Sequence, residues 1–151
     1  MKAVIQRVVS GAVFVKQGDD TSRSTRVGAI GQGLVVLLGI DIHDDEESAR
    51  KLADKIAKLR LFVDPQGKMN WHVKQAGGAI LVVSQFTLLA NTEKGNRPSF
   101  KQAMSPEPAR LLYDFFCDYI RSHYPLHVEM GCFGADMRVV IEGDGPVTIV
   151  I

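Results

Sequence analysis

The most consequential shortages in this 151-residue sequence are of cysteine and of net charge. Its two cysteines, Cys117 and Cys132, have neither the spacing of metal ligands nor the number needed for a disulfide framework. The 18 Lys and Arg residues are almost balanced by 17 Asp and Glu residues, which leaves a formal net charge of +1. The chain therefore lacks the overall basic signature of a nucleic-acid-binding protein, and a contact with RNA would have to be local.

Long hydrophobic runs are missing as well. No apolar run approaches the roughly 20 residues of a membrane-spanning helix. At the start of the sequence Gln6 and Arg7 interrupt the apolar residues, so we expect no secretory signal peptide. We expect a cytoplasmic protein without a membrane partner. The hydrophobic content of 46% is typical of a folded chain, and residues 1–151 can form one domain with a substantial core.

The common catalytic and cofactor-binding motifs do not occur. The sequence contains no His-Glu-x-x-His, no Cys-x-x-Cys, no Gly-x-x-x-x-Gly-Lys-Ser/Thr and no Gly-x-Ser-x-Gly. Its histidines are scattered, and nothing in the sequence points to a catalytic triad that would include His43, His72, His123 or His127. We therefore expect neither a metal site nor a cofactor.

The apolar pattern predicts runs of strands separated by two helices. The first helix begins at Asp44, where Asp44 and Glu47 have the spacing of a capping box. The second follows Ser105, and its buried stripe includes Leu111. Because strands and helices do not alternate, we predict an α+β fold with a largely antiparallel, strongly curved sheet. Strands are expected over residues 2–16 (one bent strand or two), 34–40, 61–63, 79–83, 128–130, 137–142 and 147–151, with a polar hairpin loop over 17–26.

A polar segment, Ser84-Gln85-Phe86-Thr87, ends the apolar run 79–83 where a buried strand would continue with Val or Ile. Ser84 and Thr87 are candidate nucleophiles, but a hydroxyl is a weak nucleophile without an adjacent base, and the sequence indicates none. Both hydroxyls are equally suited to bond the backbone at the end of the strand.

Three further features have a structural and a functional interpretation. The Gly145-Pro146 step is either a turn before the last strand or a specialised loop. Phe133 and Met137 are either core residues beside a turn or a platform for a nucleobase. In the polar loop 91–105, three cations are either solvated or in contact with phosphates: Lys94, Arg97 and Lys101.

Together, residues 84–88, 133–137 and 145–148 resemble the D-aminoacyl-tRNA deacylases, also described as the D-tyrosyl-tRNA deacylase family. The resemblance covers essentially the whole chain and extends to residues 3–8 and 97–100. It implies a barrel-like sheet with two helices packed on it. It also implies a homodimeric hydrolase that removes D-amino acids from tRNA as chiral proofreading in translation quality control.

The resemblance also implies roles for individual residues. Backbone amides of the segment Ser84, Gln85, Phe86 and Thr87 would position the ester and stabilise its oxyanion, with help from the ribose 2′-hydroxyl. Phe133 and Met137 would bind the 3′-terminal adenosine. Gly145 and Pro146, joined by a cis bond, would enter the partner subunit's site and exclude L side chains, so that glycyl-tRNA would still be accepted.

Two departures from the family pattern stand beside these motifs: Cys132 replaces a common Arg, and Gly143 a common Asn. Two other classes of function remain open. One is a non-catalytic dimeric module that binds RNA 3′ ends or nucleotides through Phe133 and residues 84–87. The other is a generic Ser or Thr esterase, which would need a base that the sequence does not show.

Overall fold

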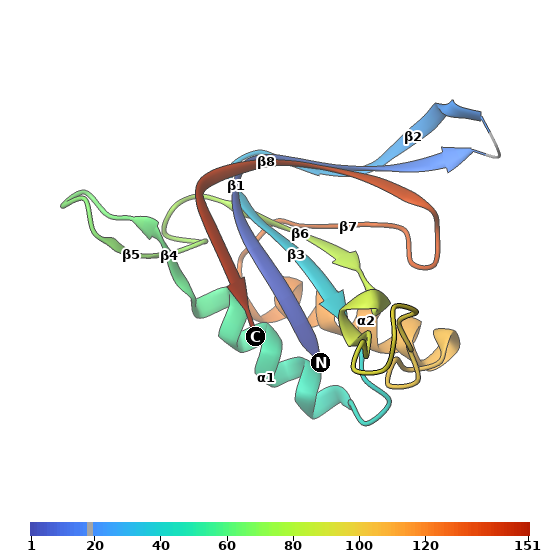
Figure 1. Cartoon of the computed structure of the whole chain (residues 1–151). Coiled ribbons are helices and arrows are strands. Elements are labelled where there is room, and N and C mark those ends of the chain that lie inside the picture. The colour runs from blue at the N-terminus through green and yellow to red at the C-terminus, as the bar shows by residue number, and fades with distance from the viewer. Residues whose placement is uncertain (18–19) are drawn as a thin grey trace.

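The computed structural model describes the backbone of residues 1–17 and 20–151. Within these residues, six strands form one strongly curved sheet, with two long helices packed against it (Figure 1). The strand order is β2-β1-β3-β6-β7, and β8 pairs with the other side of β1. These strands are β1 (Lys2–Gln17), β2 (Asp20–Ile30), β3 (Gly33–Gly39), β6 (Ala79–Ser84), β7 (Val128–Met130) and β8 (Met137–Val150).

The remaining elements lie between β3 and β7 in the chain. Helix α1 (Glu46–Lys58) leads to a small hairpin, β4 (Arg60–Val63) and β5 (Met69–His72). A short 3₁₀ helix, η1 (Phe86–Leu89), and helix α2 (Pro106–His123) follow β6. Strand β1 is antiparallel to β2, β3 and β8, whereas the β3–β6 and β6–β7 pairs are parallel because a helix lies in each connection. The predicted α+β fold with a curved, barrel-like sheet is confirmed.

Strand β1 is one long strand that bends, and β8 follows it along both of its halves. Val4 pairs with Val150 near one end, and Val15 pairs with Met137 near the other. The two strands predicted over 137–142 and 147–151 are therefore one strand. Between them the register with β1 shifts, so residues 144–147 form a bulge within this strand; of the two interpretations of Gly145-Pro146, the turn between separate strands is wrong. A bulge tolerates proline because no backbone N–H is needed there.

The predicted hairpin loop over 17–26 is shorter than expected. Residues 18 and 19 lie outside the described residues, but β2 begins at Asp20, which pairs with Gln17, and Arg26 pairs with Phe14. The backbone ladder with β1 continues beyond the last apolar residues of the strand. Polar side chains alone therefore did not indicate where the pairing ends.

Both helices begin near the predicted positions, with two corrections. Asp45, not Asp44, caps α1, because its carboxylate accepts from the Ser48 backbone N–H at 2.8 Å, and this bond lowers the Asp45 pKa. Asp44 instead contacts the N-terminal ammonium of Met1. Leu111 is 70% exposed, because α2 turns a neighbouring face toward the core. That buried face consists of Ala109, Leu112, Tyr113, Phe116, Cys117 and Ile120.

The main core lies between the helices and one face of the sheet, and it includes Ile5, Leu38, Ile56 and Phe116. A smaller core on the opposite face includes Val8 and Leu81. No helix in the described part of the chain is long and apolar enough to cross a membrane. The two cores fix β3 and β6 from both faces, and the ends of these two strands form the site described next.

Candidate active site

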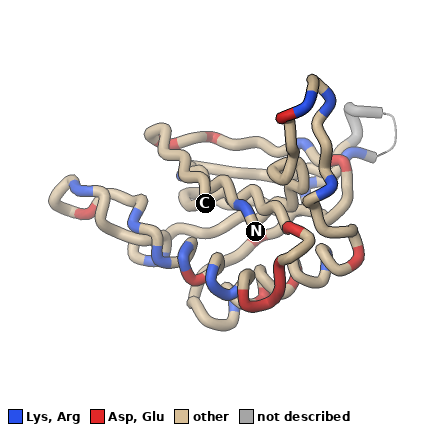
Figure 2. Tube along the Cα trace, turned by 60° about the horizontal axis from the view of Figure 1, so that its bottom comes forward, with Lys and Arg blue, Asp and Glu red and all other residues tan. Residues whose placement is uncertain are grey.

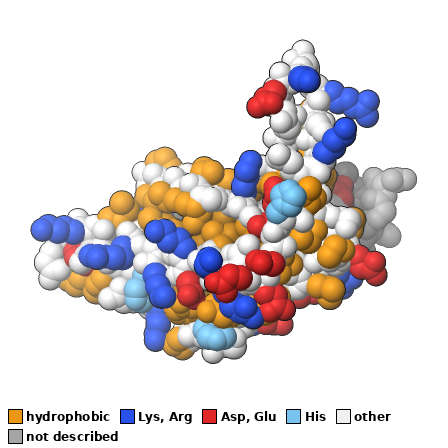
Figure 3. Space-filling view, turned by 90° about the horizontal axis from the view of Figure 1, so that it is seen from below, with side chains coloured by type: hydrophobic (Ala, Val, Ile, Leu, Met, Phe, Trp, Pro, Cys, Tyr) orange, Lys and Arg blue, Asp and Glu red, His pale blue; other side chains and the backbone are white. Residues whose placement is uncertain are grey.

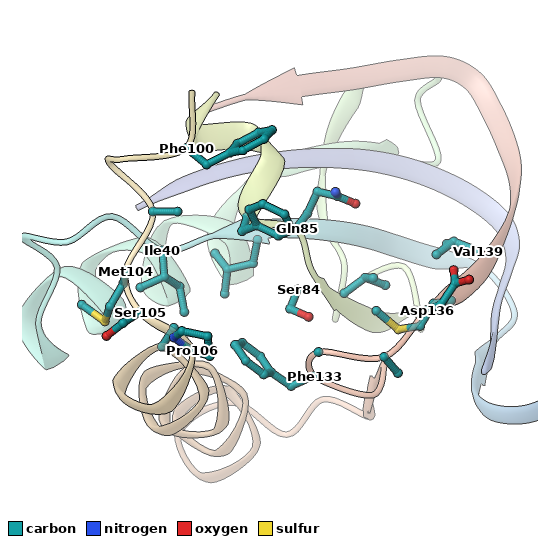
Figure 4. Close-up of a pocket in the computed structure, with 18 residues that line it drawn as sticks. Ile40, Ser84, Gln85, Phe100, Met104, Ser105, Pro106, Phe133, Asp136 and Val139 are labelled. Carbon is teal, nitrogen blue, oxygen red and sulfur yellow. The ribbon is translucent and has the colours of Figure 1, made fainter. Parts of the chain in front are cut away.

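A cavity of about 580 Å³ opens beside the carboxyl ends of β3 and β6 (Figure 4). Four separate segments line it: Leu38 and Ile40 at the end of β3, residues 83–86 from the end of β6 to the start of η1, residues from 100–109 before and within the first turn of α2, and residues from 133–139 before and within β8. Most of these side chains are apolar. A concave site of this size and lining is typical of a small-molecule or nucleotide site, and parallel strands that end at one edge commonly form such sites.

The polar segment at the end of β6 contributes Ser84, Gln85 and Phe86 to this cavity, whereas Thr87 does not line it. Ser84 pairs with Leu38 in the parallel ladder, and the chain then turns because the Gln85 backbone N–H donates to the Leu38 carbonyl at 2.7 Å. This bond makes the Gln85 N–H unavailable to a ligand. The N–H groups of Phe86 and Thr87, in the first turn of η1, have no partner among the described residues. They are the free backbone donors at the start of η1, and of these two residues only Phe86 lines the cavity.

The hydroxyls of this segment are not activated as nucleophiles in the described chain. Ser84 lines the cavity, between Phe133 and Gln85 in Figure 4, and its hydroxyl has no hydrogen-bond partner among the described residues. Thr87 is exposed and lies outside the cavity lining, and its hydroxyl accepts from the Gln85 side-chain amide. The cavity lining of the described residues contains no histidine. Its carboxylate, Asp136, pairs with Lys16 at 2.8 Å.

Phe133 and Met137 line the same cavity. The Phe133 ring packs against Tyr113 of α2, with 5.7 Å between ring centroids. Tyr113 is buried, and its hydroxyl donates to the Val82 carbonyl of β6 at 2.8 Å. Burial raises the Tyr113 pKa, so this hydroxyl stays protonated and keeps donating. Tyr113 thus connects Phe133 to β6, a role that the sequence pattern, which shows only an apolar stripe, did not indicate.

Gly145 and Pro146 are not among the residues that line the cavity of their own chain. They lie exposed on the β8 bulge, where their peptide bond is cis and the Gly145 φ is +120°. The buried Arg7 holds this bulge in place: its Nε lies 2.9 Å from an Asp144 carboxylate oxygen, and its Nη1 donates to the Leu61 carbonyl at 2.6 Å. The sequence shows Arg7 as a charged interruption of the first strand, and its contacts with Asp144 and Leu61 explain why a charged residue stands there.

The three cations predicted to contact phosphates and the two cysteines do not line the cavity. Lys94, Arg97 and Lys101 line a neighbouring hollow rather than the cavity. Cys117 is buried in α2, and burial raises its pKa to about 12, so its thiol is protonated and unreactive near neutral pH. Cys132 is exposed beside the cavity loop. The structure thus brings together Ser84, Gln85, Phe86, Phe133 and Met137, and separates them from the Gly145-Pro146 bulge.

The fold and this cavity define an α+β protein with a largely apolar ligand site that is also lined by the polar residues Ser84 and Gln85. The family model described as D-Tyr-tRNA(Tyr) deacylase matches residues 4–151. A D-aminoacyl-tRNA deacylase of Dichelobacter nodosus is 50% identical over 148 residues, 98% of this chain and 97% of that protein. A D-aminoacyl-tRNA deacylase of Escherichia coli is 48% identical over the same shares. The chain therefore belongs to the D-Tyr-tRNA(Tyr) deacylase family, as its sequence motifs predicted.

Two solved structures share this fold. A chain described as the c-Myc DNA Unwinding Element Binding Protein superimposes with a TM-score of 0.89 at 40% identity, covering 100% of this chain and 97% of that one. A probable eukaryotic D-amino acid tRNA deacylase superimposes with a TM-score of 0.80, covering 99% and 97%. At 19% identity, the second comparison shows the shared fold alone.

Proposed function

We propose that this chain hydrolyses the ester bond of D-aminoacyl-tRNA and releases the free D-amino acid and tRNA. The observation that carries the proposal is the cavity that Ser84, Gln85 and Phe86, with the free Phe86 N–H, share with Phe133 and Met137, in a member of this family. An aminoacyl-adenosine has matching parts, since a flat base is joined through a ribose to a reactive ester. The volume of about 580 Å³ is suited to such a ligand.

In this mechanism the adenine base packs against Phe133 and Met137, and the ester lies at the polar segment. The backbone N–H groups of Phe86 and Thr87 donate to the carbonyl oxygen as it becomes an oxyanion. A water molecule attacks the carbonyl carbon with help from the ribose 2′-hydroxyl. The bond between the carbonyl carbon and the ribose oxygen then breaks, and that oxygen takes up the proton that the water loses. Ser84 and Gln85 position the ester. An activated ester needs no covalent enzyme intermediate when positioning and oxyanion stabilisation are provided.

Selection of the D enantiomer is assigned to Gly145 and Pro146 of a partner subunit in a homodimer. Their exposed position on a bulge held by Arg7, outside their own chain's cavity, supports a role in trans. Their carbonyls would accept from the α-ammonium of the substrate and leave no room for an L side chain. Glycyl-tRNA, which has no side chain, would also be hydrolysed. A cytoplasmic protein of this kind would serve chiral proofreading in translation.

The decisive experiment compares D- and L-aminoacyl-tRNA of the same amino acid with purified protein. We expect multiple turnovers with the D ester and no acceleration above buffer with the L ester. Because main-chain atoms make the discrimination, D-Tyr, D-Phe and D-Asp esters should all be cleaved, and glycyl-tRNA as well. Equal rates for both enantiomers would contradict the chirality assignment, and stoichiometric binding without turnover would contradict the hydrolase.

Ser84→Ala and Thr87→Ala are expected to keep measurable deacylation, because neither hydroxyl has a base in the described chain that would activate it. We expect losses of about 10-fold or less, measured as initial rates with D-aminoacyl-tRNA. A loss of roughly the 100-fold or more that removal of a catalytic group produces would restore a nucleophilic role for that hydroxyl, provided that the variant is folded. An acyl-enzyme that is trapped by acid quench and detected by mass spectrometry would also restore that nucleophilic role.

A second candidate is a non-catalytic dimeric module that binds nucleic-acid ends. It is favoured by one observation, the 40% identity to a chain whose description is that of a DNA-element-binding protein. Phe133 and the polar segment would then bind a terminal nucleotide without cleaving it. Turnover distinguishes the two functions, since a binding module binds the end of the nucleic acid and does not release amino acid repeatedly.

A further inference from the structure

A second hollow of about 380 Å³ lies on the loop between η1 and α2, next to the cavity. This loop projects from the body of the molecule, and most of its charged side chains are Lys and Arg (Figures 2 and 3). An antiparallel bridge closes the base of the loop, because Asn91 and Ser99 each donate a backbone N–H to the other's carbonyl, at 2.8 and 2.9 Å. The projection is therefore shaped by backbone hydrogen bonds.

Three cationic side chains line this hollow: Lys94, Arg97 and Lys101. Within the described residues, no ion pair or hydrogen bond connects any of them to another side chain. The hollow also contains Glu93, whose carboxylate accepts from the Asn91 side-chain amide at 3.4 Å. The cations outnumber this carboxylate, so the hollow has a local positive charge in a chain whose formal net charge is only +1. A polyanion would be attracted here rather than to the surface as a whole.

An exposed aromatic pair lines the cavity beside the hollow. The rings of Phe86 and Phe100 meet edge to face with 5.1 Å between centroids, yet they are 57% and 37% exposed. Both residues line the cavity, while Ser99 and Lys101, on either side of Phe100, line the hollow. In Figure 4, Phe100 lies at the edge of the cavity, away from Phe133. Exposed rings beside unpaired cations are the combination that binds single-stranded nucleic acid.

We propose that this aromatic pair and hollow bind the single-stranded nucleotides that precede the terminal adenosine of the substrate RNA. The inference rests on the proposed function, in which the terminal adenosine fills the cavity. The base of the preceding nucleotide stacks on the Phe86 and Phe100 pair. Its phosphate and the next one lie among Lys94, Arg97 and Lys101, so the RNA strand leaves the cavity over Phe100.

The test uses one D-amino acid esterified to three acceptors: adenosine, the trinucleotide CCA and full-length tRNA. The wild-type kcat/KM should rise from the adenosine ester to the trinucleotide ester. Arg97→Ala and Lys94→Ala should each lose about 10-fold on the longer esters through KM, with unchanged rates on the adenosine ester, which has no phosphate. Each should also lower the slope of log KM against log salt concentration by about 0.7. Phe100→Ala should reduce the trinucleotide-to-adenosine rate ratio by about 10-fold.

Lys55→Ala is the matched control, since Lys55 is an exposed cation on α1 that does not line the hollow. It should behave as wild type on all three esters. If none of the esters is hydrolysed, the proposed function fails. If the adenosine ester is hydrolysed but the trinucleotide brings no gain, or if the loop variants slow all three esters equally, the inference fails and the proposed function stands. A monomeric Phe100→Ala in light scattering would assign the aromatic pair to a subunit contact and overturn the stacking role.

Discussion

Gly145→Ala is expected to lower the rate of D-aminoacyl-tRNA hydrolysis by about 100-fold or more while leaving most of the fold intact. Gly145 has a φ of +120°, a conformation that L side chains rarely adopt. An added Cβ would lie 2.9 Å from Arg7 Nη2 and 3.0 Å from the Val147 backbone nitrogen. The side chain would therefore displace both the bulge and the arginine that holds it. Because the bulge is exposed, the damage should be local.

Gly143→Ala provides the control for this prediction. Gly143 lies two residues earlier in β8, and a Cβ added there meets no atom within 4 Å. This variant should keep wild-type activity. Light scattering should give about twice the 16.6 kDa chain mass for the wild type and both variants, as a homodimer requires. Full activity of Gly145→Ala, or an active monomer, would show that the bulge does not act in a partner's site.

Gly33→Ala is expected to destabilise the protein by about 3 kcal/mol or more, and to leave little folded protein at 37 °C. An added Cβ would lie 1.9 Å from the Ala79 carbonyl oxygen and 2.8 Å from two further backbone atoms of Ala79. Gly33 pairs with Ala79 at the start of the parallel β3–β6 ladder. Backbone atoms cannot rotate away as a flexible side chain would, so the two strands must separate at this end.

Separation of these strands would also disturb the cavity, because the other end of the same ladder pairs Leu38 with Ser84. Urea denaturation followed by circular dichroism measures the change in the free energy of unfolding. Gly31→Ala is the matched control: Gly31 precedes the same strand, and a Cβ there meets nothing within 4 Å. It should change stability by less than about 1 kcal/mol. Equal stability of the two variants would mean that the strands tolerate a wider separation than their register implies.

The sequence predicted those parts of the fold that local patterns encode. The continuous apolar runs predicted β3 and β6, because a strand buried on both faces consists of apolar residues. The 3.6-residue periodicity predicted both helices, because a helix buried on one face repeats its apolar residues at that spacing. The errors lie where a long-range contact decided between local alternatives. The spacing of Asp44 and Glu47 predicted Asp44 as the cap of α1, but Asp44 contacts the Met1 ammonium and Asp45 caps the helix. Likewise, the strands predicted over 137–142 and 147–151 are one strand, β8, because both parts pair with β1.

The candidate site divides in the same way. Its motifs, residues 84–87, Phe133 with Met137, and Gly145-Pro146, are visible in the sequence because they break the apolar pattern with polar groups and glycines. The tertiary structure alone decided that the first two share one cavity, that the Gln85 N–H is occupied by Leu38, and that the third lies elsewhere on the bulge held by Arg7. These relations join residues more than 40 positions apart. Packing of the whole sheet sets them, and no local pattern of the chain records that packing.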